Sequence, residues 1–283
     1  MEFWGDYHTH TTYSRKGNKL HAKGSVLENA LVAAERGLKE LAITDHGFGH
    51  MYGIADENAF KKLKEDCAAA ERVTGVRIYA GLENNLDPRS GKNAELPPFL
   101  NFPKSALCEL DIVQGGYHAL IGTPKTMNNL MFWTRNSIFK FLPKRKLIEH
   151  NTVVYKRVID EYPIDFIGHL NRGIIADAVE VAKYAHERGV YIELNGRHKS
   201  LKRKEIKAMV DAGVEFICNS DAHSPDDVGK MTLGEKYIEQ CDIPHSLIAN
   251  LKKLPDFRSP NFKAARAAKT ASDIGQAVNN ADD

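Results

Sequence analysis

The chain has 283 residues, 42% of them hydrophobic and 27% charged, which is enough for one sizeable core. Its 39 basic and 37 acidic residues leave a net charge of +2, which argues against a strongly basic nucleic-acid-binding or membrane-surface protein. No apolar run reaches about 18 residues, no secretory signal opens the sequence, and the four cysteines form no CxxC pair. We therefore expect a cytoplasmic protein without disulfides.

Short apolar runs with strand character alternate with segments whose apolar residues recur at helical spacing. The predicted strands are 3–7, 41–43, 77–82, 112–116, 165–168, 190–194 and 214–218. The predicted helices are 26–36, where Ser25 is the expected cap, and 56–74, 146–161, 176–188 and 204–212. Roughly seven strand–helix units with short connections favour a parallel α/β barrel over an open sheet or separate domains.

Two stretches depart from this alternation. Residues 119–145 exceed an ordinary connection and mix aromatic with basic side chains, which is typical of an active-site lid or of a packed helical insertion. Residues 259–283 are rich in Ala, Asn and Asp, so we expect a loosely attached or partly disordered tail without a catalytic role. The remainder, 1–258, is predicted to be one barrel domain that carries the insertion.

Polar residues stand at the carboxyl ends of the predicted strands. They are His8, His10, His46, Glu83, His118, His169, Asp221 and His223. Side chains at positions i and i+2 of a strand point the same way, so His8 with His10, and Asp221 with His223, can each reach one centre. Imidazole and carboxylate form the ligand set of zinc, manganese or iron, whereas calcium prefers oxygen alone. Because burying these groups unpaired is costly, the pattern favours a metal cluster.

Several short motifs, spread over residues 8–223, carry a family resemblance. In chain order they are HTHTTYS (8–14), HAKGS (21–25), ITDHG (43–47), GLENN (81–85), GYH (116–118), IGHLNR (167–172) and NSDAH (219–223). As a set they resemble the successive motifs of the PHP family, the polymerase and histidinol phosphatase metallohydrolases. The resemblance implies a distorted (β/α)7 barrel that holds two or three divalent metal ions, which are zinc or else iron or manganese.

Carried over position by position, the resemblance implies a ligand set like that of the three-metal branch of the family. These ligands are His8, His10, His21, His46, Glu83, His118, His169, Asp221 and His223, with Glu83 as the bridging carboxylate. His21 follows His10 by eleven residues, so its role requires the intervening loop to fold back.

Some polar residues near these motifs are not implied ligands. Asp45 points to the opposite face of a regular strand from His46, and we expect it to orient a ligand or to cap the next turn. The remaining histidines, His50, His150, His186, His198 and His245, fall outside the pattern, although His198 follows a strand closely enough to line the pocket.

The resemblance implies a phosphoesterase that acts on small phosphomonoesters such as L-histidinol phosphate, a substrate of histidine biosynthesis. A metal-bridging hydroxide held by Glu83, Asp221 and His118 would attack phosphorus in line, without a serine or cysteine nucleophile. Arg172 and Arg197, just beyond two strand ends, are placed to bind phosphate oxygens, as similar arginines do in the histidinol phosphatases.

Three alternatives stay open. A phosphodiesterase or exonuclease could grip a nucleic-acid strand with the basic and aromatic residues of 140–146. An amidohydrolase barrel also opens with HxH, but it needs a carbamylated lysine on a middle strand, where this sequence offers Glu83 and His118. A metal-binding scaffold or regulatory module would keep the ligands without turnover.

Overall fold

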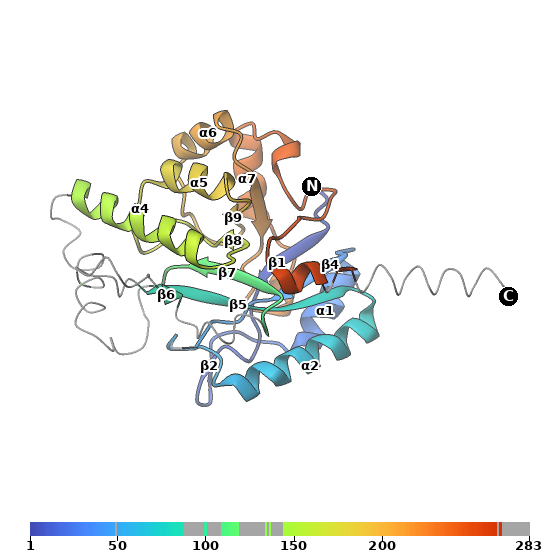
Figure 1. Cartoon of the computed structure of the whole chain (residues 1–283). Coiled ribbons are helices and arrows are strands. Elements are labelled where there is room, and N and C mark those ends of the chain that lie inside the picture. Colours follow the sequence, from blue (N-terminus) through green and yellow to red (C-terminus); the bar gives the residue numbers. More distant parts are fainter. Residues whose placement is uncertain are drawn as a thin grey trace.

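The computed structural model describes residues 1–48, 50–87, 99–100, 109–118, 134, 136, 144–264 and 266–267 (Figure 1). Its main sheet has seven parallel strands in the order β1-β4-β5-β7-β8-β9-β10. They are β1 (Gly5–Thr9), β4 (Glu40–Ile43), β5 (Arg77–Asp87), β7 (Ile112–Gly116), β8 (Phe166–Ile167), β9 (Tyr191–Asn195) and β10 (Phe216–Asn219). The short β6 (Phe99–Leu100) pairs antiparallel with β5, and β2 (Arg15–Lys16) pairs with β3 (Lys19–Leu20) in a separate hairpin.

The main sheet curves until its first and last strands meet. Thr9 forms a parallel bridge with Ala222, and the His10 backbone N–H donates to the Ala222 carbonyl at 2.8 Å. The side chain of Asn219, on β10, accepts a hydrogen bond from the Tyr7 backbone N–H at 3.0 Å. The expected distorted α/β barrel of seven parallel strands is therefore confirmed.

Helices surround the strands (Figure 1). They are α1 (Val26–Glu35), α2 (Glu57–Thr74), α4 (Lys144–Glu161), α5 (Ala178–His186), α6 (Arg203–Asp211) and α7 (Thr232–Gln240), with 3₁₀ turns η2 (Pro225–Asp227) and η3 (His245–Leu247). Ser25 caps α1 in a capping box with Glu28, as expected. Helix α7 was not predicted, because Gly234 in its interior weakens the helical pattern. A Cβ at Gly234 would lie 2.1 Å from Cys218 Sγ, so glycine is what lets α7 pack closely on β10.

A layer of aromatic and aliphatic side chains fills the barrel at the amino ends of its strands. It contains Tyr7, Ala42, Tyr79, Ile112, Phe166, Tyr191, Ile217, Ala249, Phe257 and Phe262. Phe262 belongs to a helical segment, residues 260–264, that lies beside β1 and β4 (red in Figure 1). The described residues beyond 258 are thus packed on the barrel, in contrast to the loose attachment expected from their composition.

Some predicted features fall outside the described residues. Of the expected insertion, only residues 134, 136, 144 and 145 are described, and residues 268–283 of the tail are not. Within the described part of the chain, Cys67, Cys218 and Cys241 are free thiols, and no helix is long and apolar enough to cross a bilayer.

Candidate metal centre

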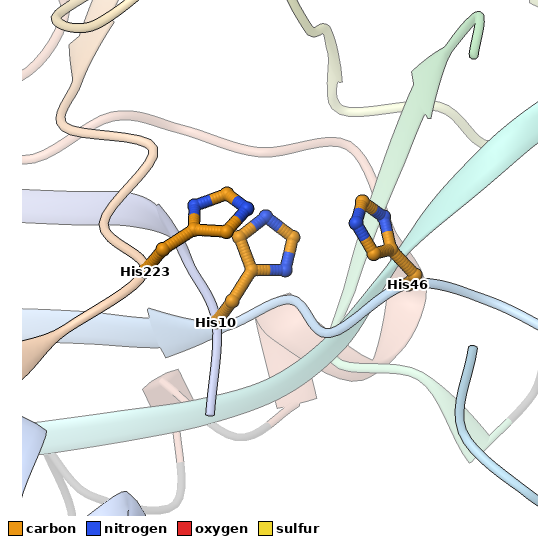
Figure 2. Close-up of side chains that lie close together, drawn as sticks. All are labelled: His10, His46 and His223. Carbon is orange, nitrogen blue, oxygen red and sulfur yellow. The ribbon is translucent and has the colours of Figure 1, made fainter. Parts of the chain in front are cut away.

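The polar residues predicted at the strand ends come together at the carboxyl end of the barrel. Figure 2 shows three of them, His10 at the end of β1, His46 after β4 and His223 after β10, with their rings gathered around a common space. The ring centroids of His10 and His223 are 4.4 Å apart, and those of His10 and His46 are 4.6 Å apart. Segments separated by up to 213 positions (223 minus 10) therefore contribute to one site.

Glu83, buried on β5, lies at the centre of this cluster. Its Oε1 is 2.7 Å from His169 Nε2, 3.4 Å from His8 Nε2 and 3.5 Å from His118 Nε2, and its Oε2 is 2.8 Å from His46 Nδ1 and 3.5 Å from His10 Nε2. One carboxylate thus faces imidazoles from both halves of the barrel. This is the position expected of a carboxylate that bridges metal ions.

Asp221 forms a second centre beside Glu83. Its Oδ1 lies 3.5 Å from His10 Nε2, 3.7 Å from His8 Nε2 and 3.4 Å from His223 Nδ1. Asp221 has a φ of 55° and His169 a φ of 27°, a backbone region that non-glycine residues seldom adopt. Such conformations persist where the surrounding structure enforces them, and they are typical of functional sites.

His21 reaches the cluster because the loop after β1 folds back. The β2–β3 hairpin precedes it, and the His21 backbone N–H donates to the Ser14 carbonyl at 2.8 Å. Its Nε2 lies 3.2 Å from His223 Nε2, so two nitrogen lone pairs face each other unless a proton or a cation lies between them. The structure therefore brings together all of the ligands that the sequence suggested.

Several buried polar atoms of the cluster make no hydrogen bond to any residue that the structure describes. They are both ring nitrogens of His10 and of His46, Glu83 Oε2 and His169 Nδ1. His46 Nδ1 is close to Glu83 Oε2, but the pair lacks hydrogen-bond geometry. Because an orphaned buried polar atom costs roughly 1–3 kcal/mol, a set of them in one place requires compensation, and cations bound between them would supply it. The residues present thus fit a metal centre.

Four groups of three donors in the described part of the chain could each hold an ion. They are His10, His46 and His223; His46, His50 and His118; His8, Glu83 and His169; and His8, His10 and Asp221, with ligand atoms within 4.8 Å of one another in each group. The groups share members, as expected where neighbouring ions are bridged by common ligands.

The protonation states also suit metal binding. Burial lowers the pKa of His10 to about 3 and that of His46 to about 4, so both rings are neutral at pH 7. Burial alone would raise the pKa of Glu83 and Asp221, but the surrounding imidazoles hold both pKa values well below the usual range. Neutral imidazole and ionised carboxylate are the forms that bind cations.

Glu193, on β9, is a buried carboxylate that the sequence analysis missed. Its Oε1 lies 2.7 Å from His8 Nδ1 and accepts from Asn219 Nδ2 at 3.1 Å. Its Oε2 accepts from the His169 backbone N–H at 2.7 Å and from Asn195 Nδ2 at 2.9 Å. Although burial opposes a charged ring, Glu193 and the nearby carboxylates raise the pKa of His8 well above its usual value. In the neutral form of His8, Nδ1–H donates to Glu193, and the lone pair of Nε2 faces Glu83, Asp221 and the side-chain amide of Gln114.

Asp45 organises the loop after β1 instead of joining the cluster. It accepts from the Thr11 backbone N–H at 2.8 Å, from the Thr11 hydroxyl at 2.6 Å and from the Ser14 hydroxyl at 2.6 Å. The Ser14 oxygen in turn accepts from the His46 backbone N–H at 3.2 Å. Asp45 thus connects the loop that carries His10 to the one that carries His46, and its hydrogen-bond partners are Thr11 and Ser14 rather than the ligand imidazole expected for it.

A cavity of about 300 Å³ opens directly above the cluster. Its lining includes His21, His46, His118, Asp221 and His223, together with Arg172, Arg197 and His198. The backbone N–H groups of Arg197 and His198 both donate to Asn195 Oδ1, at 2.9 and 2.7 Å, which fixes the turn after β9. His50 and Tyr52 line the same cavity, although neither was predicted to belong to the site.

The fold and this cluster define a class of metal-binding α/β barrels, and comparison with known proteins identifies the family. Residues 6–197 match the PHP domain, and the chain belongs to the PHP family. A probable phosphatase of Acetivibrio thermocellus is 30% identical over 259 residues, which cover 88% of this chain and 92% of that protein. A probable phosphatase of Clostridium novyi is 29% identical over 261 residues, which cover 88% of this chain and 91% of that protein.

Solved structures agree on the fold. Histidinol phosphate phosphatase from Lactococcus lactis, crystallised with zinc, L-histidinol and phosphate, superposes with a TM-score of 0.58 at 16% identity and covers 91% of this chain and 97% of its own. A putative histidinol phosphatase from Listeria monocytogenes gives a TM-score of 0.54 at 14% identity, covering 80% of this chain and 97% of its own. The solved structures thus agree with the fold, and the match to the PHP domain over residues 6–197 confirms the family resemblance.

Proposed function

We propose that the chain is a metal-dependent phosphatase that hydrolyses small phosphomonoesters. The observation that carries this proposal is the composition of one cavity, where Arg172 and Arg197 line the wall above a buried cluster of imidazoles and carboxylates. A phosphate dianion needs positive charge on its non-bridging oxygens, and guanidinium groups bind such oxygens in a fork. The curated relatives, which are probable phosphatases, support the same activity.

The nine predicted ligands would hold two or three divalent ions, with Glu83 and Asp221 as the anionic members of the set. Zinc is the first candidate because the Lactococcus lactis structure contains it, and iron and manganese suit the same donors. When bound, such ions supply a nucleophile at neutral pH and neutralise charge that develops on the phosphoryl oxygens.

The remaining residues of the cavity would orient the substrate. Arg172 follows the His169 turn, with its backbone N–H donating to the His169 carbonyl at 2.9 Å, so its position is tied to the cluster. Arg197 and His198 are tied to Asn195, whose side-chain amide also donates to Asp221 Oδ2 at 3.1 Å. The side chains proposed to bind phosphate and those proposed to bind metal are thereby held at fixed positions relative to one another. Catalysis requires such fixed positions of the reacting groups.

We propose L-histidinol phosphate as the first substrate to test, with a place in histidine biosynthesis. Two observations support a substrate of this size: a cavity of about 300 Å³, at the small end of the range for ligand pockets, and the L-histidinol and phosphate in the Lactococcus lactis structure. No lysine is among the described residues that line the cavity, which favours a phosphoesterase over an amidohydrolase with a carbamylated lysine.

A substrate panel tests the proposal. The full-length protein would be stripped with EDTA, reloaded with zinc, manganese or iron, and assayed on p-nitrophenyl phosphate, L-histidinol phosphate, bis(p-nitrophenyl) phosphate and single-stranded DNA. We expect metal-dependent release of phosphate from the monoesters and much slower cleavage of the diesters. Preference for the diesters would instead indicate a phosphodiesterase or exonuclease. Tightly bound metal without any hydrolysis would indicate a scaffold.

Removing either arginine tests the phosphate site. Arg172→Ala and Arg197→Ala should each lower kcat/KM on p-nitrophenyl phosphate by about 10- to 100-fold, because each removes hydrogen bonds to a charged group. Metal content, measured by plasma emission spectrometry, should stay unchanged. Arg72→Ala, on the exposed side of α2, is the matched control and should leave the kinetics unaltered. Normal kinetics in both cavity variants would disprove their assigned role.

A further inference from the structure

His50 lies inside the site although it follows no strand and belongs to none of the motifs. Its ring centroid is 3.9 Å from that of His46 and 5.2 Å from that of His118. It also lines the cavity that Arg172 and Arg197 line. His50 therefore contacts the space that a substrate would occupy, which raises the question of what its imidazole does there.

The turn that carries His50 is built by close backbone contacts. The His50 N–H donates to the Gly47 carbonyl at 3.2 Å, the Gly53 N–H donates to the His50 carbonyl at 3.0 Å, and the Ile54 N–H donates to the His46 carbonyl at 2.8 Å. A Cβ at Gly53 would lie 2.2 Å from the Gly47 carbonyl oxygen, so only glycine fits at this point. The position of His50 is thus a product of the local fold.

The same turn decides which ring nitrogen of His50 carries the proton. The backbone N–H of Tyr52 donates to His50 Nδ1 at 3.2 Å, so Nδ1 carries a lone pair and the proton is on Nε2. Coordination of a metal through Nε2 would move that proton to Nδ1, where it would oppose the Tyr52 N–H and cost the turn a hydrogen bond. His50 is therefore built as a hydrogen-bond donor, in contrast to His46 and His118 beside it.

We propose that His50 is a substrate-binding residue whose Nε2–H donates a hydrogen bond to an oxygen of the bound phosphoester. This assignment rests on the proposed phosphatase function, and it adds to the two arginines a neutral donor from the opposite half of the chain. His50 binds the phosphoryl oxygen without becoming a ligand of the metal centre.

Replacing His50 with an amide residue tests the proposal, because each amide can stand in for only one of the two ring nitrogens. The side-chain amide of His50→Gln can place an N–H near the position of Nε2, whereas His50→Asn reaches only the position of Nδ1. In the metal-loaded full-length protein, His50→Asn should raise both KM for p-nitrophenyl phosphate and Ki for inorganic phosphate by about 10- to 100-fold. His50→Gln should recover most of that loss. His245→Asn, on the exposed η3 turn, is the control for the substitution itself.

Each outcome separates this assignment from its rivals. Metal content equal to that of the wild type in both variants, combined with the ordered loss of phosphate affinity, supports it. Loss of bound metal in His50→Asn would show that His50 is a ligand, and unchanged Ki in both variants would show that it does not touch phosphate. Either result would overturn the assignment while the wild-type activity stands. A wild-type protein that neither hydrolyses monoesters nor binds phosphate would overturn the proposed function itself.

Discussion

The two ends of the barrel each contain a buried glutamate, and the two carboxylates differ in their hydrogen bonding. At the amino end, Glu40 on β4 accepts from the Tyr7 hydroxyl at 2.5 Å, from the Tyr79 hydroxyl at 3.0 Å, and from Arg266 at 2.8 Å to each oxygen. At the carboxyl end, Glu83 on the neighbouring strand β5 leaves Oε2 without a hydrogen bond. Both oxygens of Glu40 have hydrogen-bond partners, whereas Oε2 of Glu83 has none among the described residues.

The contrast between Glu40 and Glu83 indicates that one end of the barrel contributes to stability and the other to function. A satisfied buried carboxylate holds parts of a fold together, whereas a cluster of unsatisfied polar atoms requires a partner such as a bound ion or water. At the amino end, the aromatic rings of Tyr7 and Phe257 pack edge to face with centroids 4.9 Å apart, and those of Tyr79 and Phe262 are 4.8 Å apart. We therefore expect substitutions at that end to change stability, and substitutions at the other end to change metal and substrate binding.

Glu193 gives the sharpest test of this division, because it is a satisfied carboxylate at the functional end. In Glu193→Gln, one oxygen becomes an amide nitrogen that opposes a donor, either His8 Nδ1–H or the His169 N–H. Since such supporting residues orient a ligand, we expect metal affinity or activity to fall by about 10- to 100-fold. Titration with a competing chelator would measure the affinity, and Glu187→Gln, on the surface after α5, is the control. A loss of stability at normal metal affinity would assign Glu193 to the scaffold instead.

The polar residues of the site could be predicted because they stand directly at the ends of predicted strands. His8, His46 and Asp221 each follow an apolar run, and the carboxyl ends of parallel strands meet at one edge whatever the helices between them do. The sequence order of the strands is also their order in the sheet, so no distant pairing had to be guessed. The fold class and the eight polar residues at strand ends therefore followed from local patterns, whereas His21 and the ligand roles were implied by the family resemblance alone.

The missed residues depend on tertiary contacts. His50 reaches the site through a turn whose geometry is decided by the approach of Gly53 to Gly47, and no periodicity marks it. Glu193 did leave a signal, since a single acidic residue within the buried strand β9 must have a partner. The composition of residues 259–283 suggested a loose tail, but in its described part Phe262 and Arg266, spaced by one helical turn, both reach the barrel.

Arg266 tests the amino end of the barrel. Arg266→Ala removes two hydrogen bonds from the Glu40 carboxylate, and the free energy of unfolding should fall by about 1.5–3 kcal/mol. Urea denaturation would measure the change, with Lys263→Ala as the control because that side chain is exposed on the same segment. Metal content and kcat/KM of the folded protein should match the wild type. Impaired metal binding in this variant would show that the two ends are coupled and would break the division proposed above.

The buried carboxyl group of Asp165, immediately before β8, should make stability depend on pH. Burial raises its pKa to about 7, although the backbone N–H groups of Val113 and Ser259 donate to it and oppose the rise. The unfolded value is about 3.9, so the folded protein binds the proton more tightly. The stabilising contribution is therefore fully present below about pH 4 and is lost as the pH rises toward 7. Relative to Asp165→Asn, the wild type should lose about 2–3 kcal/mol of unfolding free energy between pH 5 and pH 8.

The comparison with Asp165→Asn isolates this residue, because the titration of the histidines at the other end is common to both proteins. Urea unfolding of the two EDTA-treated proteins at several pH values would give the difference, and any constant offset caused by the amide cancels. A difference that does not change with pH would show that Asp165 is ionised throughout. Ser259 and Val113 would then be bound to a charged carboxylate, and their hydrogen bonds together with the charge of Arg258 would outweigh the effect of burial on the pKa of Asp165.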